Sequence, residues 1–400
     1  MQEPARCDVE PRAGAGCSLE GAPGRCLLAL IVLAALLAPG RIAPEALEPL
    51  LEPIRAARDV PALAAAVARD GRIVAVGATG LRALGHDVRV TREDRFHIGS
   101  CTKAMTATLA AVLVERGRIR WDTTVAEGLP HLPEAMHAGW STATLEMLLQ
   151  NRGGLPNATW PAGLDGLGVF MLSRDPQVQR RSFVGRHLAA APAYEPGSRY
   201  VYSNAGYSVA GEMLAQAGGA SYESLLVREV LAPIGIRSAG FGPAGRLGDE
   251  PDQPWGHAER GGKRVALPPG PLADNPPAIT PAGRVHLSIA DWALFAAFHA
   301  GDGMAGGRRL LQESALRRLQ APPEGGEYAA GWVVTTRAWG GGTVLTHAGS
   351  NTYHYAVAWV APARRFAVVA ATNTAGPAAE RACDEACAAA IGRFLREGAE

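Results

Sequence analysis

Strand-like segments lie at both ends of this chain, and helical segments lie between them. Near the N-terminus, residues 61–80 (PALAAAVARDGRIVAVGATG) predict two strands around a turn at Asp70-Gly71. Residues from about 120 to 240 carry mainly helical patterns, and strand-like runs return at 328–336, 343–349, 354–361 and 365–373. The most economical arrangement is an α/β fold of the α+β sandwich kind. It has an antiparallel sheet built from both termini, flanked by helices, with an inserted mainly helical lobe.

Periodic patterns with start and stop signals predict helices at 44–60, 100–116, 141–150, 203–218, 288–301 and 378–395. Residues 240–283 hold nine prolines and little periodicity, which predicts a long irregular segment of the kind that is functional or mobile. We therefore expect a single domain over 41–397. Its sheet lobe spans about 41–119 and 288–397, and its helical lobe spans about 120–287.

The longest apolar run, at 26–38, follows Arg25 and precedes the small residue Gly40. It resembles a secretory signal peptide and is too short for a comfortable transmembrane span. The segment before it is unusually long for a signal peptide and holds several acidic residues. An uncleaved anchor or a start site further downstream is the alternative. We expect residues 1–40 to be a signal peptide or a membrane anchor and the protein to be exported, periplasmic or secreted. If it is anchored to a membrane, we expect the anchor to be residues 26–38.

Charge and cysteine content exclude several classes of protein. The 39 basic and 38 acidic residues give a net charge of +1, and no basic stripe predicts nucleic-acid binding. Six cysteines do not make a disulfide framework at this length. We interpret Cys383 and Cys387, which are four residues apart, as two small apolar residues on one face of a helix. No spacing of His, Cys and Asp suggests zinc, so we expect no metal and no cofactor. The oligomeric state stays open.

Lysine is almost absent from the chain. Only Lys103 and Lys263 are lysines among the 39 basic residues, so 37 are arginines. Lys263 lies in a polar turn and is expected to be a solvated charge. Lys103 lies among apolar neighbours and three residues after Ser100, on the same face of a predicted helix. A buried lysine can lose its proton, as arginine cannot, and can then accept the proton of a serine.

Two further motifs follow along the chain. In "EPGSRYVYSNAGY", Tyr202 and Asn204 stand between a turn and a helix, where they either pack and cap or take part in chemistry. A tyrosine whose pKa is lowered by a nearby cation can relay protons. In "VLTHAGSN", His347 and Gly349 end a predicted strand, and the glycine allows the backbone to approach a substrate closely. The alternative is a local hydrogen bond and nothing more, which we expect for His97, His257, His286 and His354.

In this order, Ser-x-x-Lys, Tyr-x-Asn and His-x-Gly resemble the motifs of the serine β-lactamase and penicillin-binding protein family. The nearest branch is related to class C β-lactamases and includes esterases, D-amino-acid peptidases and DD-carboxypeptidases. The likeness covers about 47–395, including "RFHIGSCTK", "LLQNRGGLP", "PAGRVHLSIADW" and "HAGSN".

The resemblance implies a role for each motif residue. Ser100 would be the nucleophile that forms an acyl-enzyme, and Lys103 and Tyr202 would share the general-base and general-acid work. The remaining residues would bind substrate: Asn204, which also positions Lys103; His347 and Gly349, on the sheet edge; and Ser350, whose backbone N–H would form the oxyanion hole with that of Ser100.

The chain departs from the family pattern at two points. His347 stands where many β-lactamases have lysine, and a neutral histidine binds a substrate carboxylate poorly. Asn151 stands in a turn where many relatives have His-Thr-Ser-Gly, and there we expect only a structural effect. Hydrolysis of a small ester is therefore our first expectation, and peptidase or weak β-lactamase activity on a small molecule or short peptide our second. An acyltransferase, or a penicillin-binding sensor without turnover, remains the alternative.

Overall fold

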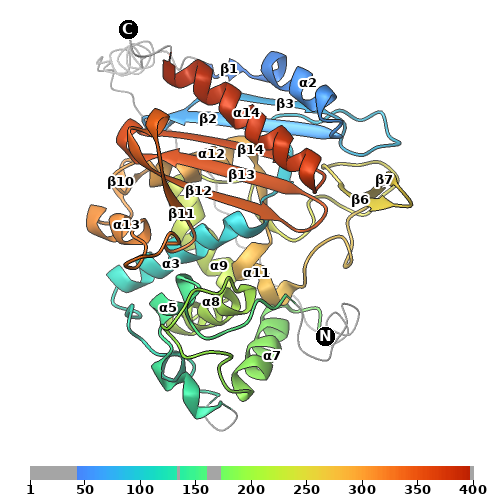
Figure 1. Ribbon diagram of the computed structural model, residues 1–400. Helices are drawn as coiled ribbons and strands as arrows, with labels where there is room; N and C mark the ends of the chain where they lie inside the picture. Colours follow the sequence, from blue (N-terminus) through green and yellow to red (C-terminus); the bar gives the residue numbers. More distant parts are fainter. Residues whose placement is uncertain (1–42, 133–135, 160–172, 397–400) are drawn as a thin grey trace, which may run out of the picture. The chain divides into compact units, whose positions relative to one another are not determined.

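A computed structural model gives the fold of residues 43–132, 136–159 and 173–396 (Figure 1). Within these ranges, Pro44 begins a single compact unit. The expected signal peptide or anchor at 1–40 lies outside the described residues. Within the three described ranges, no helix combines the length and hydrophobicity that crossing a membrane requires.

The main sheet has seven strands and joins the two ends of the chain, as predicted. Its order is β1-β3-β2-β14-β13-β12-β11. β2 pairs with β14 from Ala64 opposite Ala371 to Arg69 opposite Phe366. The pairs are antiparallel except β1 with β3, which is parallel and corrects our expectation of a purely antiparallel sheet. The strands are β1 (Glu45–Ala46), β2 (Ala62–Arg69), β3 (Arg72–Gly80), β11 (Val333–Arg337), β12 (Gly342–Ser350), β13 (Tyr355–Ala361) and β14 (Phe366–Thr372).

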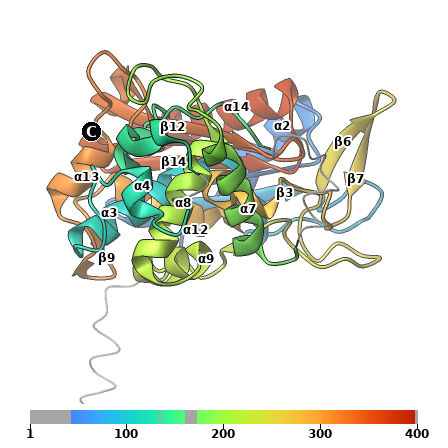
Figure 2. The same ribbon diagram turned by 90° about the horizontal axis from the view of Figure 1, so that it is seen from below.

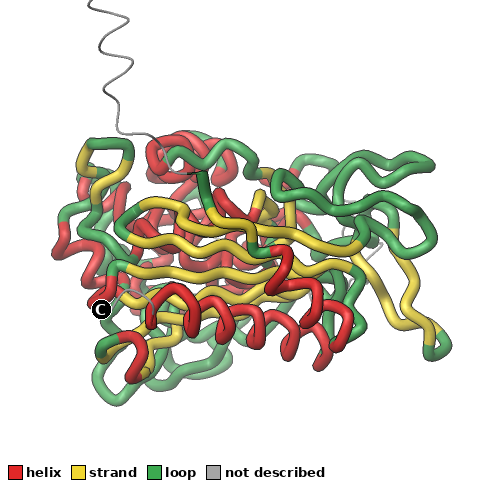
Figure 3. Tube along the Cα trace, turned by 90° about the horizontal axis from the view of Figure 1, so that it is seen from above, coloured by secondary structure: helices red, strands yellow, loops and turns green. Residues whose placement is uncertain are grey.

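Successive residues of the central strands point into two different cores. In β2, Ala64 and Ala66 face one cluster, while Leu63 and Val67 face the other. Helices α2 (Glu48–Ala57) and α14 (Pro377–Arg396) cover the second core, and α14 runs along the strands (Figures 1 and 3). Helix α12 (Ile289–His299) covers the opposite face of β2 and β14. With both faces covered, these strands are apolar throughout rather than alternating.

Further helices pack beyond α12 on that same side of the sheet and form the predicted helical lobe (Figures 1 and 2). Helix α8 begins at Asn204 with Ser203 as its N-cap, as expected, whereas the helix expected at 141–150 begins only at Leu145. A 3-10 turn occupies Ala138–Thr142, and the side chain of Thr144 caps the helix by accepting the backbone N–H of Met147. The elements are α3 (Thr102–Glu115), α4 (Val125–Gly128), α5 (Leu145–Leu149), α7 (Pro176–Ala189), α8 (Asn204–Gly218), α9 (Tyr222–Leu226), α10 (Ala232–Ile234), α11 (Thr280–Gly283) and α13 (Glu313–Leu319).

The segment at 240–283 is more regular than we predicted. It contains a hairpin of β6 (Gly256–Arg260) and β7 (Lys263–Leu267), turned at Gly261 and Gly262, which both have positive φ. A Gly-Gly pair between two short runs is a hairpin signal that the surrounding prolines obscured. The segment also supplies β5 (Gly240–Phe241), which joins β8 (Val285–Ser288) and β4 (Arg95–His97) in a small sheet. A further hairpin joins β9 (Met304–Ala305) and β10 (Arg308–Arg309).

Candidate active site

Ser100 lies in a single 3-10 turn, η1 (Gly99–Cys101), between β4 and α3. Gly99 has a φ of +49°, which a residue with a side chain adopts rarely, so this glycine permits the sharp entry into the helix. The side chain of Ser100 is partly exposed, whereas Lys103, one turn later, is fully buried. The Nζ atom of Lys103 lies 3.3 Å from the Oγ atom of Ser100. The expected pairing on one helix face is thus present.

The amine of Lys103 has three polar neighbours. Its Nζ lies 2.7 Å from Oδ1 of Asn204 and 2.8 Å from the backbone carbonyl of Ala282 in α11. Asn204 in turn donates from Nδ2 to Thr159 at 3.0 Å, which turns its oxygen toward the lysine. Both oxygens can only accept, so they take two N–H groups of the lysine and leave its third position toward Ser100.

Burial lowers the pKa of Lys103 well below its ordinary value, because the charged amine has lost its water. The groups that act on this pKa include no carboxylate. A neutral amine would use its two N–H groups for Asn204 and Ala282 and would point its lone pair at the Ser100 hydroxyl. This arrangement is suited to removing the serine proton.

Tyr202 lies on the other side of the lysine, with Nζ 4.5 Å from the centre of its ring. We expected a nearby cation to lower the pKa of this tyrosine, and that expectation is wrong. Burial raises the pKa of Tyr202, and a hydrogen bond with the Ser100 side chain offsets only part of the rise. No cation is among the groups that lower the pKa of Tyr202. Tyr202 is therefore a neutral phenol near pH 7 and is suited to donating a proton.

The end of β12 lies directly against the Ser100 turn. A Cβ atom on Gly349 would lie 2.1 Å from the carbonyl oxygen of Ile98 and 2.6 Å from the backbone nitrogen of Ser100. A Cβ atom on Gly99 would lie 2.3 Å from the backbone nitrogen of Ser350. We expected Gly349 to admit a substrate; instead it admits the backbone of the Ser100 turn. The two N–H groups expected to form the oxyanion hole thus belong to neighbouring backbone segments.

His347 lies deeper along β12 and is almost inaccessible. Its Nδ1 lies 2.6 Å from the carbonyl oxygen of Ala348, so Nδ1 must carry the proton, and Nε2 accepts from the hydroxyl of Tyr328 at 3.2 Å. Burial, and then Lys103, lowers the pKa of His347 to about 4. The histidine is therefore neutral at pH 7, as its position in the third motif led us to expect.

The sequence reasoning missed three partners of these residues: Tyr328, Thr159 and the Ala282 carbonyl. The rings of Tyr200, Tyr202 and His347 all lie within 6.4 Å of the Tyr328 ring. The only sequence feature that could have pointed to Tyr328 was the "YAAGW" stretch before β11. Its Gly331 packs on the backbone of Ala104, where a Cβ would lie 2.5 Å away. A carbonyl contact such as that of Ala282 has no side-chain signature at all.

Asn151 has the structural role that we expected. It adopts a φ of +56°, and its Oδ1 accepts the backbone N–H of Ser203 at 3.0 Å. Its carbonyl accepts the N–H of Val201 at 2.8 Å. These two bonds hold the short segment that carries Tyr202.

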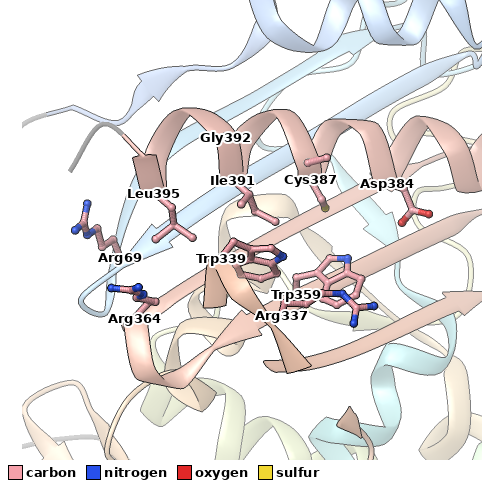
Figure 4. A pocket seen from close by; sticks show the side chains of 11 residues that line it. Arg69, Arg337, Trp339, Trp359, Arg364, Asp384, Cys387, Ile391, Gly392 and Leu395 are labelled. Atoms are coloured by element: carbon pink, nitrogen blue, oxygen red, sulfur yellow. The ribbon is translucent and has the colours of Figure 1, made fainter. Parts of the chain in front are cut away.

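The described surface has several grooves, of which one adjoins this site and another lies elsewhere. One groove lies between α14 and the ends of β11 and β13, where Trp339, Trp359 and three arginines line it (Figure 4). It contains none of the predicted site residues. The other begins at Asn351, directly after Ser350, and is lined mainly by apolar residues of 247–273 and by Tyr353. Within the described ranges, no group of His, Cys, Asp or Glu is arranged to hold a metal ion.

Comparison with protein families gives one match that spans most of the chain. Residues 47–391 match the family model described as Beta-lactamase. Penicillin-binding protein 4 of Amycolatopsis lactamdurans is 28% identical over 307 residues, which cover 73% of each chain. The putative penicillin-binding protein PbpX of Bacillus subtilis (strain 168) is 24% identical over 68% of this chain, but over only 61% of its own length.

Solved structures show the same fold at low identity. The octameric penicillin-binding protein homologue from Pyrococcus abyssi superposes with a TM-score of 0.68 at 21% identity, over 88% of this chain and 78% of its own. The D-amino acid amidase from Ochrobactrum anthropi SV3 gives 0.67 at 20%, over 88% and 98%. A class C β-lactamase from Rhodobacter sphaeroides gives 0.65 at 21%, over 86% and 98%. The β-lactamase and transpeptidase type of fold that the sequence indicated is confirmed.

Proposed function

The chain belongs to the β-lactamase family, and from this premise we propose that it is a serine hydrolase that forms an acyl-enzyme on Ser100. The observation that carries the proposal is the environment of Lys103. Its amine is buried, two carbonyl oxygens hold it, and it faces the serine hydroxyl at 3.3 Å. A lysine in that setting is a general base, because it can accept a proton at neutral pH.

Acylation would begin when Lys103 Nζ takes the proton of Ser100 Oγ as this oxygen attacks the carbonyl carbon of the substrate. The carbonyl oxygen becomes an oxyanion, which the backbone N–H groups of Ser100 and Ser350 would bind. When the intermediate collapses, the bond to the leaving group breaks. The leaving group takes a proton that passes from Lys103 through the hydroxyl of Tyr202.

Deacylation would run the same proton path in reverse. A water molecule gives one proton through the hydroxyl of Tyr202 to Lys103, while the water oxygen attacks the acyl carbon. The bond between that carbon and Ser100 Oγ then breaks, and Oγ regains its proton. Each group returns to its starting state, so the cycle consumes only substrate and water.

Two features favour an uncharged substrate that carries an apolar group. His347 is neutral, so β12 offers no fixed cation for a substrate carboxylate. The groove that continues from Asn351 exposes Leu247 and Leu272, whose accessible fractions of 76% and 63% are the largest among the exposed large hydrophobic residues. Covering this apolar surface, which begins one residue after Ser350, would favour binding. We therefore place small apolar esters first, and amides or D-amino-acid peptides second.

The test is the intact mass of the full-length protein after separate incubation with a fluorophosphonate, a penicillin and p-nitrophenyl butyrate. The matched control is Ser100→Ala. We expect a stoichiometric fluorophosphonate adduct and ester turnover with the wild type only, and a slow or absent penicillin adduct. A rapid penicillin adduct would favour the peptidase branch. No adduct from any reagent would overturn the proposal.

A further inference from the structure

A buried carboxylate, Asp274, lies beside the Ser100 turn and outside the three motifs. Its two oxygens accept from Nε2 of His97 at 3.1 Å, from Nδ2 of Asn351 at 3.0 Å and from Nε of Arg284 at 3.2 Å. The backbone N–H of Asn275 donates to it at 2.8 Å. The side chains of Asp274, His97, Asn351 and Arg284 are all buried. We call Asp274, His97 and Asn351 the Asp274 network.

The first arm of the network leads to the nucleophile. The Nδ1 atom of His97 accepts the backbone N–H of Gly99 at 3.1 Å. An atom that accepts this bond carries no proton, so the proton of a neutral His97 is on Nε2, which donates to Asp274. Gly99 immediately precedes Ser100. The histidine therefore joins the buried carboxylate to the peptide next to the first expected oxyanion donor.

The second arm leads to the end of β12. Asn351 immediately follows Ser350, and its Nδ2 donates to Asp274. Its Oδ1 accepts the backbone N–H groups of Tyr353 at 3.1 Å and of His354 at 2.9 Å, which closes the turn after the strand. One carboxylate thus ties together the two segments that carry the Ser100 and Ser350 N–H groups.

A stability role alone explains this cluster poorly. Burial acts to raise the pKa of Asp274, but His97, Arg284 and the hydrogen bond from Asn351 outweigh it and hold the pKa below its usual range. The carboxylate is therefore charged in the interior, where apolar residues of similar size stabilise a fold as well or better. What an apolar cluster cannot provide is directional contact with both backbone segments at once.

We propose that Asp274, His97 and Asn351 are positioning residues that set the spacing and direction of the Ser100 and Ser350 N–H groups in the oxyanion hole. The inference rests on the proposed acyl-enzyme function. It also revises our expectation for His97, whose hydrogen bonds are not merely local: they connect residues 177 positions apart in the chain. Neither of the other two network residues was singled out by the sequence.

Two substitutions at one position separate positioning from stability. His97→Asn places an amide oxygen near the Nδ1 position, so it keeps the acceptor for Gly99 and loses the donor to Asp274. His97→Gln places an amide nitrogen near the Nε2 position, so it keeps the donor to Asp274 and loses the acceptor for Gly99. If the network positions the donor peptide, His97→Gln loses more kcat; if it only satisfies a buried charge, His97→Asn loses more of both kcat and Tm.

The experiment measures kcat, kcat/KM and Tm of the full chain with p-nitrophenyl butyrate, at a temperature where each variant is folded by circular dichroism. For His97→Gln we expect kcat and kcat/KM to fall together by about 10- to 100-fold, with the smaller loss of Tm. For His97→Asn we expect the smaller loss of kcat and the larger loss of Tm. The control is His299→Asn, a buried histidine bound to Thr108 at 3.0 Å, which should lose Tm and keep kcat.

Asn351→Asp gives the same test from the second arm, because it keeps the acceptor for Tyr353 and His354 and removes the donor to Asp274. We expect kcat to fall about tenfold, which is less than the effect of deleting an oxyanion donor. Losses of kcat that follow Tm across all variants, or an unchanged kcat in His97→Gln and Asn351→Asp, would overturn the inference. A wild type that neither turns over nor labels would instead overturn the proposed function.

Discussion

Replacing Gly349 by alanine would test the contact between β12 and the Ser100 turn. The strand conformation at this position is one that any residue adopts, so the substitution adds no backbone strain. Its effect is steric alone. The new methyl group would lie 2.1 Å from the Ile98 carbonyl oxygen, 2.6 Å from the Ser100 nitrogen and 2.9 Å from the Cys101 nitrogen. All three are backbone atoms, which cannot rotate away as a side chain would.

The size of the displacement follows from these distances. Cβ atoms essentially never lie within 3.0 Å of another heavy atom, so β12 and η1 must separate by about 0.9 Å at the closest point (3.0 minus 2.1). Displacements of about 1 Å at a reacting centre cost about 100-fold in rate, equivalent to about 2.7 kcal/mol of transition-state stabilisation. Overpacking of this kind destabilises a fold by about 1–3 kcal/mol.

The assay compares Gly349→Ala with Gly185→Ala by ester turnover, fluorophosphonate labelling rate and thermal unfolding. Gly185 lies inside α7, its added Cβ would meet nothing within 4 Å, and its φ is not positive. An alanine there should stabilise the helix by about 0.5–1 kcal/mol and leave kcat unchanged. For Gly349→Ala we expect kcat to fall about 100-fold while the protein remains folded. A kcat within threefold of the wild type would show that the close approach does not position the Ser350 N–H, and the reasoning would be refuted.

Lys103→Arg should lower kcat by about 10²–10⁴-fold, because a guanidinium keeps its proton; near-normal ester turnover would remove the lysine from the mechanism. His347→Lys should raise kcat/KM for p-nitrophenyl hemisuccinate relative to p-nitrophenyl butyrate about tenfold, through one charge-assisted hydrogen bond, and an unchanged ratio would contradict a binding role. Acid should unfold the protein. Five buried histidines have a folded pKa of about 3 to 4, below their ordinary 6.5, so the unfolded chain binds more protons and stability falls from pH 6.5 toward 4. These are His257, His286, His299, His347 and His354. Each contributes about 3–5 kcal/mol at most, and a Tm that is flat from pH 7 to 5 by circular dichroism would contradict this.

Much of the fold was predictable because its elements carry local signals. The apolar run of β2 and the turn at Asp70-Gly71 that follows it mark a hairpin, and Ser203 marks the start of α8. Pairing between β2 and β14 followed from the order of elements, since two apolar groups of strands at opposite ends need partners. The parallel β1 strand was not predictable, because two residues are too few to show a period. The β6–β7 hairpin was missed because its apolar content is low and prolines surround it.

In the candidate site too, residues that belong to a local sequence pattern were predictable, and contacts between distant parts of the chain were not. Lys103 stood out because a chain that otherwise uses arginine keeps a lysine in an apolar helix, and its burial agrees with the reason given for it. The environment of that lysine depends on Asn204 and on the Ala282 carbonyl, which lie 101 and 179 residues further along the chain. Of these two, only Asn204 belongs to a recognisable sequence motif. Asp274 had no motif at all and lies in a segment that we read as irregular. A segment that holds a buried charge against two backbone turns needs a fixed path rather than a repeating pattern. Proline fixes the backbone along such a path, and it also interrupts the periodic pattern by which a helix or strand is recognised in a sequence. The residues that orient a site of this kind are therefore expected where the sequence pattern is weakest, and the His97 variants test that expectation in this chain.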